Sequence, residues 1–229
     1  MSRNSSPSPF HAVAFDLDGL MVNTEDIYDE VLETFLGRRG FAFTLDLKLA
    51  MMGLTARDAF GVLSQRFGLE QELDVIQHEV ERIFFELIPQ KIRTMEGLFS
   101  LFEQIDQRSI PRVVVTSSPR KLANWAMKFA GIERNFQFVL TGDDIERGKP
   151  DPQIYQLAMQ KLNVAPTQLM VFEDSYNGSL AAARAGAFTI AVPGRHSVNQ
   201  DFSHADLVVS SLQDQRIFDL LVEFRQPYN

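Results

Sequence analysis

Two aspartates one residue apart stand directly after a short apolar segment near the start of the sequence. Ala12–Phe15 fits a short buried strand, and Asp16, Asp18 and Gly19 come after it. Alternate residues of an extended chain point to the same side, so both carboxylates can face one pocket where the strand ends. Carboxylates this close repel each other and generally need a cation between them. The pattern therefore predicts a divalent metal site in which one carboxylate stays free for chemistry.

Three more sets of polar side chains follow predicted buried strands or stand on the loops after them. Open parallel sheets bind ligands outside the carboxyl ends of their strands, so these residues can meet at one edge. Each set alone is a weak signal, because hydroxyl residues often cap helices and acids often stand in solvated turns. Their coincidence at one edge favours a shared site. The sets are Thr116 to Ser118 after the second strand, Lys149 between Gly148 and Pro150, and Glu173 with Asp174 after the fourth strand.

The carboxylates are the residue types that phosphoryl transfer needs. Negative charge on the phosphoryl oxygens must be stabilised by Mg²⁺ and by fixed hydrogen-bond donors. Mg²⁺ prefers a few carboxylates with water and substrate oxygens, which Asp16 and Asp174 can provide. Asp16 can also attack phosphorus and form an aspartyl phosphate. Asp18 can protonate the leaving oxygen and later activate water.

The remaining residues fit a binding site for the phosphate group. Thr116 and the backbone N–H of Ser117 can hold a phosphoryl oxygen, and Ser118 extends this run of hydroxyls. Lys149 offers a positive charge to the same oxygens and to the attacking carboxylate. Asp151–Pro152 fits the start of a helix, so the loop that carries the lysine is expected to be stiff.

Strands and helices alternate after residue 97, which predicts an α/β fold with a Rossmann-like parallel sheet covered by helices on both faces. The predicted strands of this part are Pro111–Thr116, Phe138–Thr141, Gln168–Phe172, Phe188–Val192 and an edge strand at Leu207–Val209. The predicted helices are Gly97–Arg108, Arg120–Gly131, Gln153–Leu162, Gly178–Ala185 and Ile217–Phe224.

The segment between the first strand and this alternating part has helical spacing only. Thr24–Ile88 contains no convincing strand, and its helices are expected to stop at Gly37, Gly68 and Pro89. An all-helical domain inserted after the first strand explains this pattern. We expect a core domain of residues 1–20 and 93–229, with residues 1–9 as a polar tail, and a helical cap domain of residues 21–92.

Composition excludes several classes of protein. The net charge of −8 argues against a general nucleic-acid binder. The absence of cysteine excludes disulfides, thiolate zinc sites and a cysteine nucleophile. No apolar run reaches membrane-spanning length, and the polar start lacks the apolar stretch of a signal peptide. We expect a cytoplasmic monomer or weak dimer that acts on a small phosphorylated metabolite, with neither nucleic acid nor membrane as partner.

Taken in order, the four motifs resemble those of the haloacid dehalogenase-like hydrolase superfamily. The motifs are Asp-x-Asp-Gly, Thr-Ser-Ser, Gly-Lys-Pro-x-Pro and Glu-Asp, and the resemblance runs from about Phe10 to Phe224. The helical insert is similar to the cap of the branch that holds small phosphatases and β-phosphoglucomutase. The resemblance implies Mg²⁺-dependent hydrolysis of a small phosphomonoester, of the sugar phosphate or nucleoside monophosphate type, through an aspartyl phosphate.

The resemblance also implies a role for each motif residue. Asp16 would be the nucleophile and Asp18 the general acid and base. The carboxylates of Asp16 and Asp174 and the backbone carbonyl of Asp18 would bind Mg²⁺. Glu173 would be either a ligand or, as we favour, a neighbour that orients Asp174. The residues that would hold the phosphate are Thr116 and Lys149.

Two residues depart from the family pattern. Asn23 stands where an aspartate is usual, and we expect it to cap the first helix of the insert. Glu96 replaces a usual proline and touches no chemistry. Six further residues are weaker candidates, and a structural role without chemistry is the better interpretation for them. They are Asp143 and Asp144 in a turn and Gly53, Thr55, Arg57 and Asp58 in the insert.

Three other functions remain to be weighed. A phosphomutase would use the same two aspartates, but the stretch Ile83–Phe85, where its second-phosphate lysine is expected, is apolar. A dehalogenase needs neither Asp18 nor Mg²⁺. A receiver domain, which is a phospho-acceptor module and no enzyme, carries its aspartate after the third strand, whereas this chain has Leu140–Thr141 there. Hydrolysis is therefore favoured, with the mutase as the alternative.

Overall fold

The computed structural model describes residues 10–51, 56–69 and 73–222, so the predicted tail at 1–9 lies outside the described residues. The chain forms two compact units. One unit combines the residues up to Asn23 with those from Arg93 onward, and the other is Thr24–Ile92. Asn23, rather than Leu20, is the last residue of the first unit before the insert.

The first unit is built on a six-stranded parallel sheet with the strand order β3-β2-β1-β4-β5-β6. The α/β class and the parallel sheet predicted from the sequence are therefore confirmed. β1 lies at the centre, between β2 and β4, which is the point where the direction of winding reverses and where such sheets bind ligands. The strands are β1 (Ala12–Phe15), β2 (Arg112–Val115), β3 (Val139–Leu140), β4 (Leu169–Glu173), β5 (Phe188–Ala191) and β6 (Leu207–Val208).

Apolar and β-branched residues make the central strands buried on both faces. All four residues of β1 and all five of β4 are buried. Phe15 at the end of β1 pairs in register with Phe172 of β4, and their rings stack 5.0 Å apart. This pairing fixes the level at which the two strands end, and so brings the residues that follow them to the same edge.

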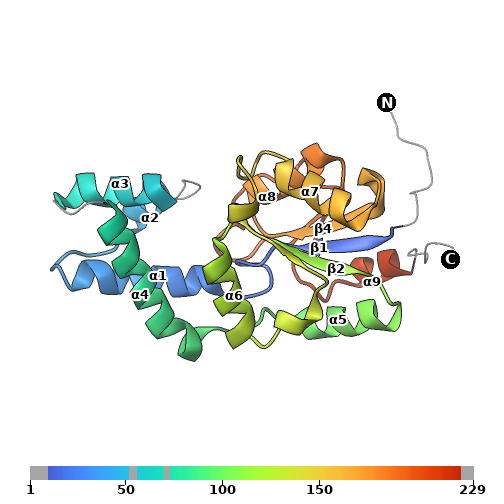
Figure 1. Ribbon diagram of the computed structural model, residues 1–229, viewed down its shortest axis with the longest axis horizontal. Helices are drawn as coiled ribbons and strands as arrows, with labels where there is room; N and C mark the ends of the chain where they lie inside the picture. Colours follow the sequence, from blue (N-terminus) through green and yellow to red (C-terminus); the bar gives the residue numbers. More distant parts are fainter. Residues whose placement is uncertain (1–9, 52–55, 70–72, 223–229) are drawn as a thin grey trace. The chain divides into compact units, whose positions relative to one another are not determined.

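Helices cover both faces of this sheet. Figure 1 shows α7 and α8 on one side of the strands and α5 and α9 on the other. The apolar stripe of α7 packs into the core with Ile154, Tyr155, Ala158 and Met159. The helices are α5 (Leu98–Gln107), α6 (Arg120–Phe129), α7 (Gln153–Leu162), α8 (Tyr176–Ala185) and α9 (Gln215–Leu221).

In its described part, the inserted unit contains helices and the turns between them, and no strand. Tyr28 of α1 stacks on Phe84 of α4 with ring centroids 4.7 Å apart. The short helix α2 was not predicted from the sequence. The prediction that a helix ends before Pro89 is wrong, because Pro89 lies within α4. Pro89 has no N–H to donate to the carbonyl four residues earlier, but α4 runs only to Lys91, so few residues follow the lost bond. The helices are α1 (Thr24–Gly37), α2 (Leu45–Met51), α3 (Ala56–Phe67) and α4 (Leu73–Lys91).

The two segments that lead into and out of the insert are paired with each other. Val22 and Thr94 form an antiparallel bridge, and the N–H of Met95 donates to the carbonyl of Met21 over 2.8 Å. The side-chain oxygen of Asn23 accepts a bond from the N–H of Arg93 at 2.6 Å. This bond ties the two segments together, and it is a contact that the sequence did not predict. In the described part of the chain, no helix is both long and apolar enough to cross a membrane.

Candidate active site

The predicted motif residues meet at the carboxyl end of the three central strands. Asp16 follows β1 directly, and its N–H donates to the carbonyl of Phe172 in β4 over 3.0 Å. Thr116 follows β2, and Asp174 follows β4. Asp16, Thr116 and Asp174 are all buried, although each carries a polar side chain. Buried polar side chains need partners, so the bonds at this edge indicate what each residue does there.

Lys149 joins the first motif to the fourth. Its ammonium group donates to Asp16 Oδ1 over 2.6 Å, to Glu173 Oε1 over 2.6 Å and to the carbonyl of Val115 over 2.9 Å. A lysine has three N–H donors, and these three acceptors use all of them. Lys149 therefore holds the Asp16 carboxylate, and it can contact a phosphoryl oxygen only by sharing or exchanging one of these bonds.

The electrostatics of this pair follow from burial and charge. Burial raises the pKa of Asp16 well above its ordinary value, Lys149 opposes that rise, and the charges of Glu173 and Asp18 add to it. Burial alone would lower the pKa of Lys149, but the carboxylates of Asp16 and Glu173 more than offset it and raise the pKa. The lysine is therefore a fixed cation at neutral pH, while the Asp16 charge is only partly compensated by the protein.

Glu173 is bonded to the lysine and to two hydroxyl groups. Its carboxylate is fully buried and accepts bonds from Lys149 and from the Tyr155 hydroxyl at Oε1, both over 2.6 Å, and from Ser175 at Oε2 over 3.2 Å. It therefore pairs with the lysine. The sequence analysis missed Tyr155. The signal was available, because a single tyrosine stands in the apolar stripe of the helix that directly follows Lys149.

Asp18 is held by the hydroxyl residues after β2. Thr116 Oγ1 and Ser118 Oγ both donate to Asp18 Oδ2, over 2.8 and 2.7 Å. Thr116 Oγ1 also accepts the N–H of Ser118 over 3.0 Å. These bonds fix the side chain of Asp18 from one side. The Thr116 proton is committed to Asp18 in this arrangement, so Thr116 must turn its hydroxyl to hold a phosphoryl oxygen.

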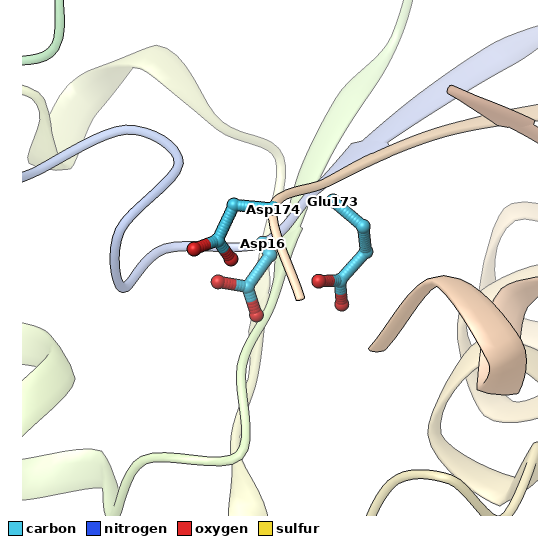
Figure 2. Close-up of side chains that lie close together, drawn as sticks. All are labelled: Asp16, Glu173 and Asp174. Atoms are coloured by element: carbon cyan, nitrogen blue, oxygen red, sulfur yellow. The ribbon is translucent and has the colours of Figure 1, made fainter. Parts of the chain in front are cut away.

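Three buried carboxylates form a cluster that could hold a metal ion. Asp16, Glu173 and Asp174 each bring one oxygen to within 4.8 Å of the others, and Figure 2 shows the Asp16 carboxylate between the other two. Oxygen atoms alone suit Mg²⁺ or a similar hard cation. Gly19 lies against the same cluster, because a Cβ built there would be 2.3 Å from Asp174 Oδ2. The donor set and its excess of negative charge fit a divalent cation.

The remaining candidate residues are Ser117, two acids after β3 and four residues of the insert. The side chain of Ser117 is exposed. Asp143 and Asp144 shape the turn after β3: Asp143 accepts the N–H of Arg120, and Asp144 accepts the N–H of Thr141 over 2.8 Å. For the insert candidates, Gly53 and Thr55 lie outside the described residues, and the side chains of Arg57 and Asp58 are not described.

Known proteins share both the sequence pattern and the fold. A family model described as haloacid dehalogenase-like hydrolase matches residues 13–192. A phosphorylated carbohydrates phosphatase of Thermotoga maritima is 32% identical over 76% of this chain and 81% of its own length. A validoxylamine A 7′-phosphate phosphatase of Streptomyces hygroscopicus subsp. limoneus is 30% identical over 90% of this chain and 96% of its own length.

Solved structures agree with this result. A crystal structure from Thermotoga maritima that is assigned by name to β-phosphoglucomutase superposes with a TM-score of 0.78 at 28% identity, over 93% of this chain and 99% of that chain. The match of the family model covers most of the sheet and all of the motifs described above. The chain belongs to the haloacid dehalogenase-like hydrolase family and is an enzyme of its phosphatase branch.

Proposed function

We propose that this enzyme hydrolyses a small phosphomonoester, of the sugar phosphate or nucleoside monophosphate type, with Mg²⁺ and through an aspartyl phosphate on Asp16. The observation that carries the proposal is the position of the Asp16 carboxylate. Lys149 binds its Oδ1 over 2.6 Å, and the carboxylate of Asp174 lies on its other side. A carboxylate held in this way has one oxygen oriented by the protein and a second one available for attack.

In the first step, a carboxylate oxygen of Asp16 forms a bond to phosphorus, and the bond from phosphorus to the ester oxygen breaks. Asp18 donates its proton to the leaving alcohol. In the second step, Asp18 takes a proton from water as the water attacks phosphorus, and the bond from phosphorus to the Asp16 oxygen breaks. Inorganic phosphate is released, and the Asp16 carboxylate is restored. The bonds of Asp18 to Thr116 and Ser118 support this role, because they hold its carboxyl group in one orientation.

Mg²⁺ would be held by the carboxylates of Asp16 and Asp174 and by the backbone carbonyl of Asp18. When bound, the ion would neutralise charge on the phosphoryl oxygens. The close approach of Gly19 to Asp174 supports the backbone ligand, because it brings the chain at 18–19 against that carboxylate. Lys149 and the hydroxyl of Thr116 would supply the protein's share of the phosphate contacts. The net charge of −8 supports a small substrate over a nucleic acid.

The names of the relatives support hydrolysis and a phosphorylated carbohydrate or related compound as substrate. The mutase alternative would need a second phosphate contact. In the stretch Ile83–Phe85, where we looked for it, Ile83 and Phe84 are buried apolar side chains of the helical unit. This packing supports the hydrolase.

Phosphate release distinguishes the two functions. The chain is incubated with a hexose 6-phosphate, a hexose 1-phosphate and a nucleoside 5′-monophosphate, with Mg²⁺ or with EDTA. We expect stoichiometric release of inorganic phosphate from at least one compound with Mg²⁺, and its loss with EDTA and in Asp16→Asn. Isomerisation of the hexose 1-phosphate that needs a bisphosphate and releases no phosphate would contradict the proposal.

A further inference from the structure

Tyr155 is a core residue with one polar atom, and that atom points to the active site. The residue is fully buried in the first turn of α7, where its ring packs in the apolar core formed with β1, β2 and β4. A buried phenol needs a hydrogen-bond partner. Its hydroxyl donates to Glu173 Oε1 over 2.6 Å. The contact therefore connects the hydrophobic core to the carboxylate cluster.

The bonds of Glu173 hold it on the side of Lys149. Oε1 accepts from both Lys149 and Tyr155, and Oε2 accepts from Ser175. Behind the carboxylate lies Gly178, where a Cβ would be 2.0 Å from Oε1. The glycine leaves just enough room for the carboxylate in this orientation.

Glu173 nevertheless lies close enough to take part in metal binding. One of its oxygens is within 4.8 Å of oxygens of Asp16 and Asp174 (Figure 2). If Glu173 gave Oε1 to an ion, Lys149 and Tyr155 would lose their shared acceptor. Two roles therefore compete for the same carboxylate, and the two bonds at Oε1 favour the role of lysine partner.

We propose that Tyr155 is a positioning residue that keeps Glu173 on Lys149 and out of contact with the metal ion. The ion then receives carboxylate oxygens from Asp16 and Asp174 alone. Mg²⁺ suits a site with one or two carboxylates and several waters, whereas Ca²⁺ accepts more oxygen ligands at longer distances. Tyr155 thereby sets the preference for Mg²⁺ over Ca²⁺. The inference rests on the proposed function, because it takes the metal site from it.

The test is metal binding by the full chain, measured by isothermal titration calorimetry with MgCl₂ and with CaCl₂. Tyr155→Phe removes the hydroxyl and keeps the ring. We expect the affinity for Ca²⁺ to rise by about three- to tenfold, because the ion gains a contact to Glu173 while Glu173 gives up its bond to Lys149. The affinity for Mg²⁺ should change less. With Mg²⁺, we expect kcat to fall, because the lysine that holds Asp16 is displaced. We expect KM for the phosphomonoester to rise, because the same lysine is one of the proposed phosphate contacts.

Two further variants separate this role from a general loss of packing. Tyr176→Phe is the matched control, because Tyr176 is partly exposed and lies outside the carboxylate cluster. Its ring packs edge-on against the ring of His204. We expect this variant to bind Mg²⁺ and Ca²⁺ with wild-type affinities. In the double variant Tyr155→Phe with Glu173→Gln, the rise in Ca²⁺ affinity disappears, because an amide brings no charge to the ion.

Each outcome of these titrations bears either on this inference alone or also on the proposed function. An unchanged or weaker Ca²⁺ affinity in Tyr155→Phe, with phosphatase activity dependent on Mg²⁺ in the wild type, overturns this inference alone. A rise that persists in the double variant also overturns it, because the effect would not run through Glu173. A wild-type chain that binds neither ion overturns the metal site of the proposed function, and this inference with it.

Discussion

Charged pairs are used differently at the strand ends and in the helical insert. At the strand ends, the side chains of Asp16, Lys149 and Glu173 are between 0% and 9% exposed and paired with each other. In the insert, the side chains of Lys48 and Asp29 are 20% and 28% exposed. Burying an ion costs several kcal/mol, and a surface pair contributes about 0–1 kcal/mol. Stability alone therefore does not explain the buried cluster, and a role in chemistry does.

The largest expected effect comes from the nucleophile. Asp16→Asn keeps the shape of the side chain and removes its charge, so we expect kcat to fall by at least about 10⁴-fold, as when a catalytic nucleophile is removed, with the fold intact. The matched control in the insert is Asp29→Asn, which loses only a pair with Lys48 and stays within about twofold of wild type. Phosphate release and circular dichroism check both variants. A nearly active Asp16→Asn would remove Asp16 from the chemistry.

Removing the cation of each region should change stability by different amounts. Lys149→Met leaves two buried carboxylates without their shared partner, and we expect the free energy of unfolding to fall by about 3–5 kcal/mol. Lys48→Met in the insert breaks a partly exposed pair and should cost less than about 1 kcal/mol. Urea denaturation in EDTA measures both. Equal losses would mean that burial does not distinguish the two regions.

The pH dependence of stability should have opposite sign in the two regions. Burial raises the pKa of Asp16, so the folded state binds more protons than the unfolded state. In EDTA, its contribution to the free energy of unfolding therefore falls as pH rises above 3.8, the ordinary pKa. The bond from Arg39 lowers the pKa of Glu79, so its contribution is present above the ordinary value of 4.5 and is lost as pH falls below it.

Denaturation between pH 3.5 and 7 in EDTA, about the range in which carboxyl groups titrate, checks this contrast. The difference in unfolding free energy between wild type and Asp16→Asn should decrease with rising pH. The difference between wild type and Glu79→Gln should increase, and it should stay below about 1 kcal/mol because Glu79 lies near the surface. The same slope in both series would contradict the contrast.

The fold was largely predictable because its strands are short, apolar and β-branched, and because glycines and prolines separate them. The errors came from local signals that the surroundings outweigh. Pro89 looked like a stop but lies in the last turn of α4. The bond from the N–H of Arg93 to Asn23 could not be predicted, because the two residues are distant in sequence. The short helix α2 (Leu45–Met51) has too few residues for a clear period.

The site was predictable to the level of residue types and strand ends. Partners across the sheet were not, because a single sequence does not reveal which side chains share an acceptor. The pairing of Glu173 with Lys149 and Tyr155 depends on how α7 packs on the sheet, and no spacing in the sequence records it. Likewise, the bonds of Thr116 and Ser118 to Asp18 could not be distinguished in advance from contacts to a phosphate.

The central claim is that Asp16 carries the phosphoryl group during turnover. The most direct measurement is acid quenching of the enzyme during steady turnover of a good phosphomonoester with Mg²⁺, followed by mass spectrometry of the peptide that contains residues 12–19. We expect one added phosphoryl group on Asp16 in the wild type, and none on this peptide in Asp16→Asn, which lacks the attacking carboxylate. A phosphoryl group on another residue, or none on this peptide while turnover proceeds at full rate, would contradict the mechanism.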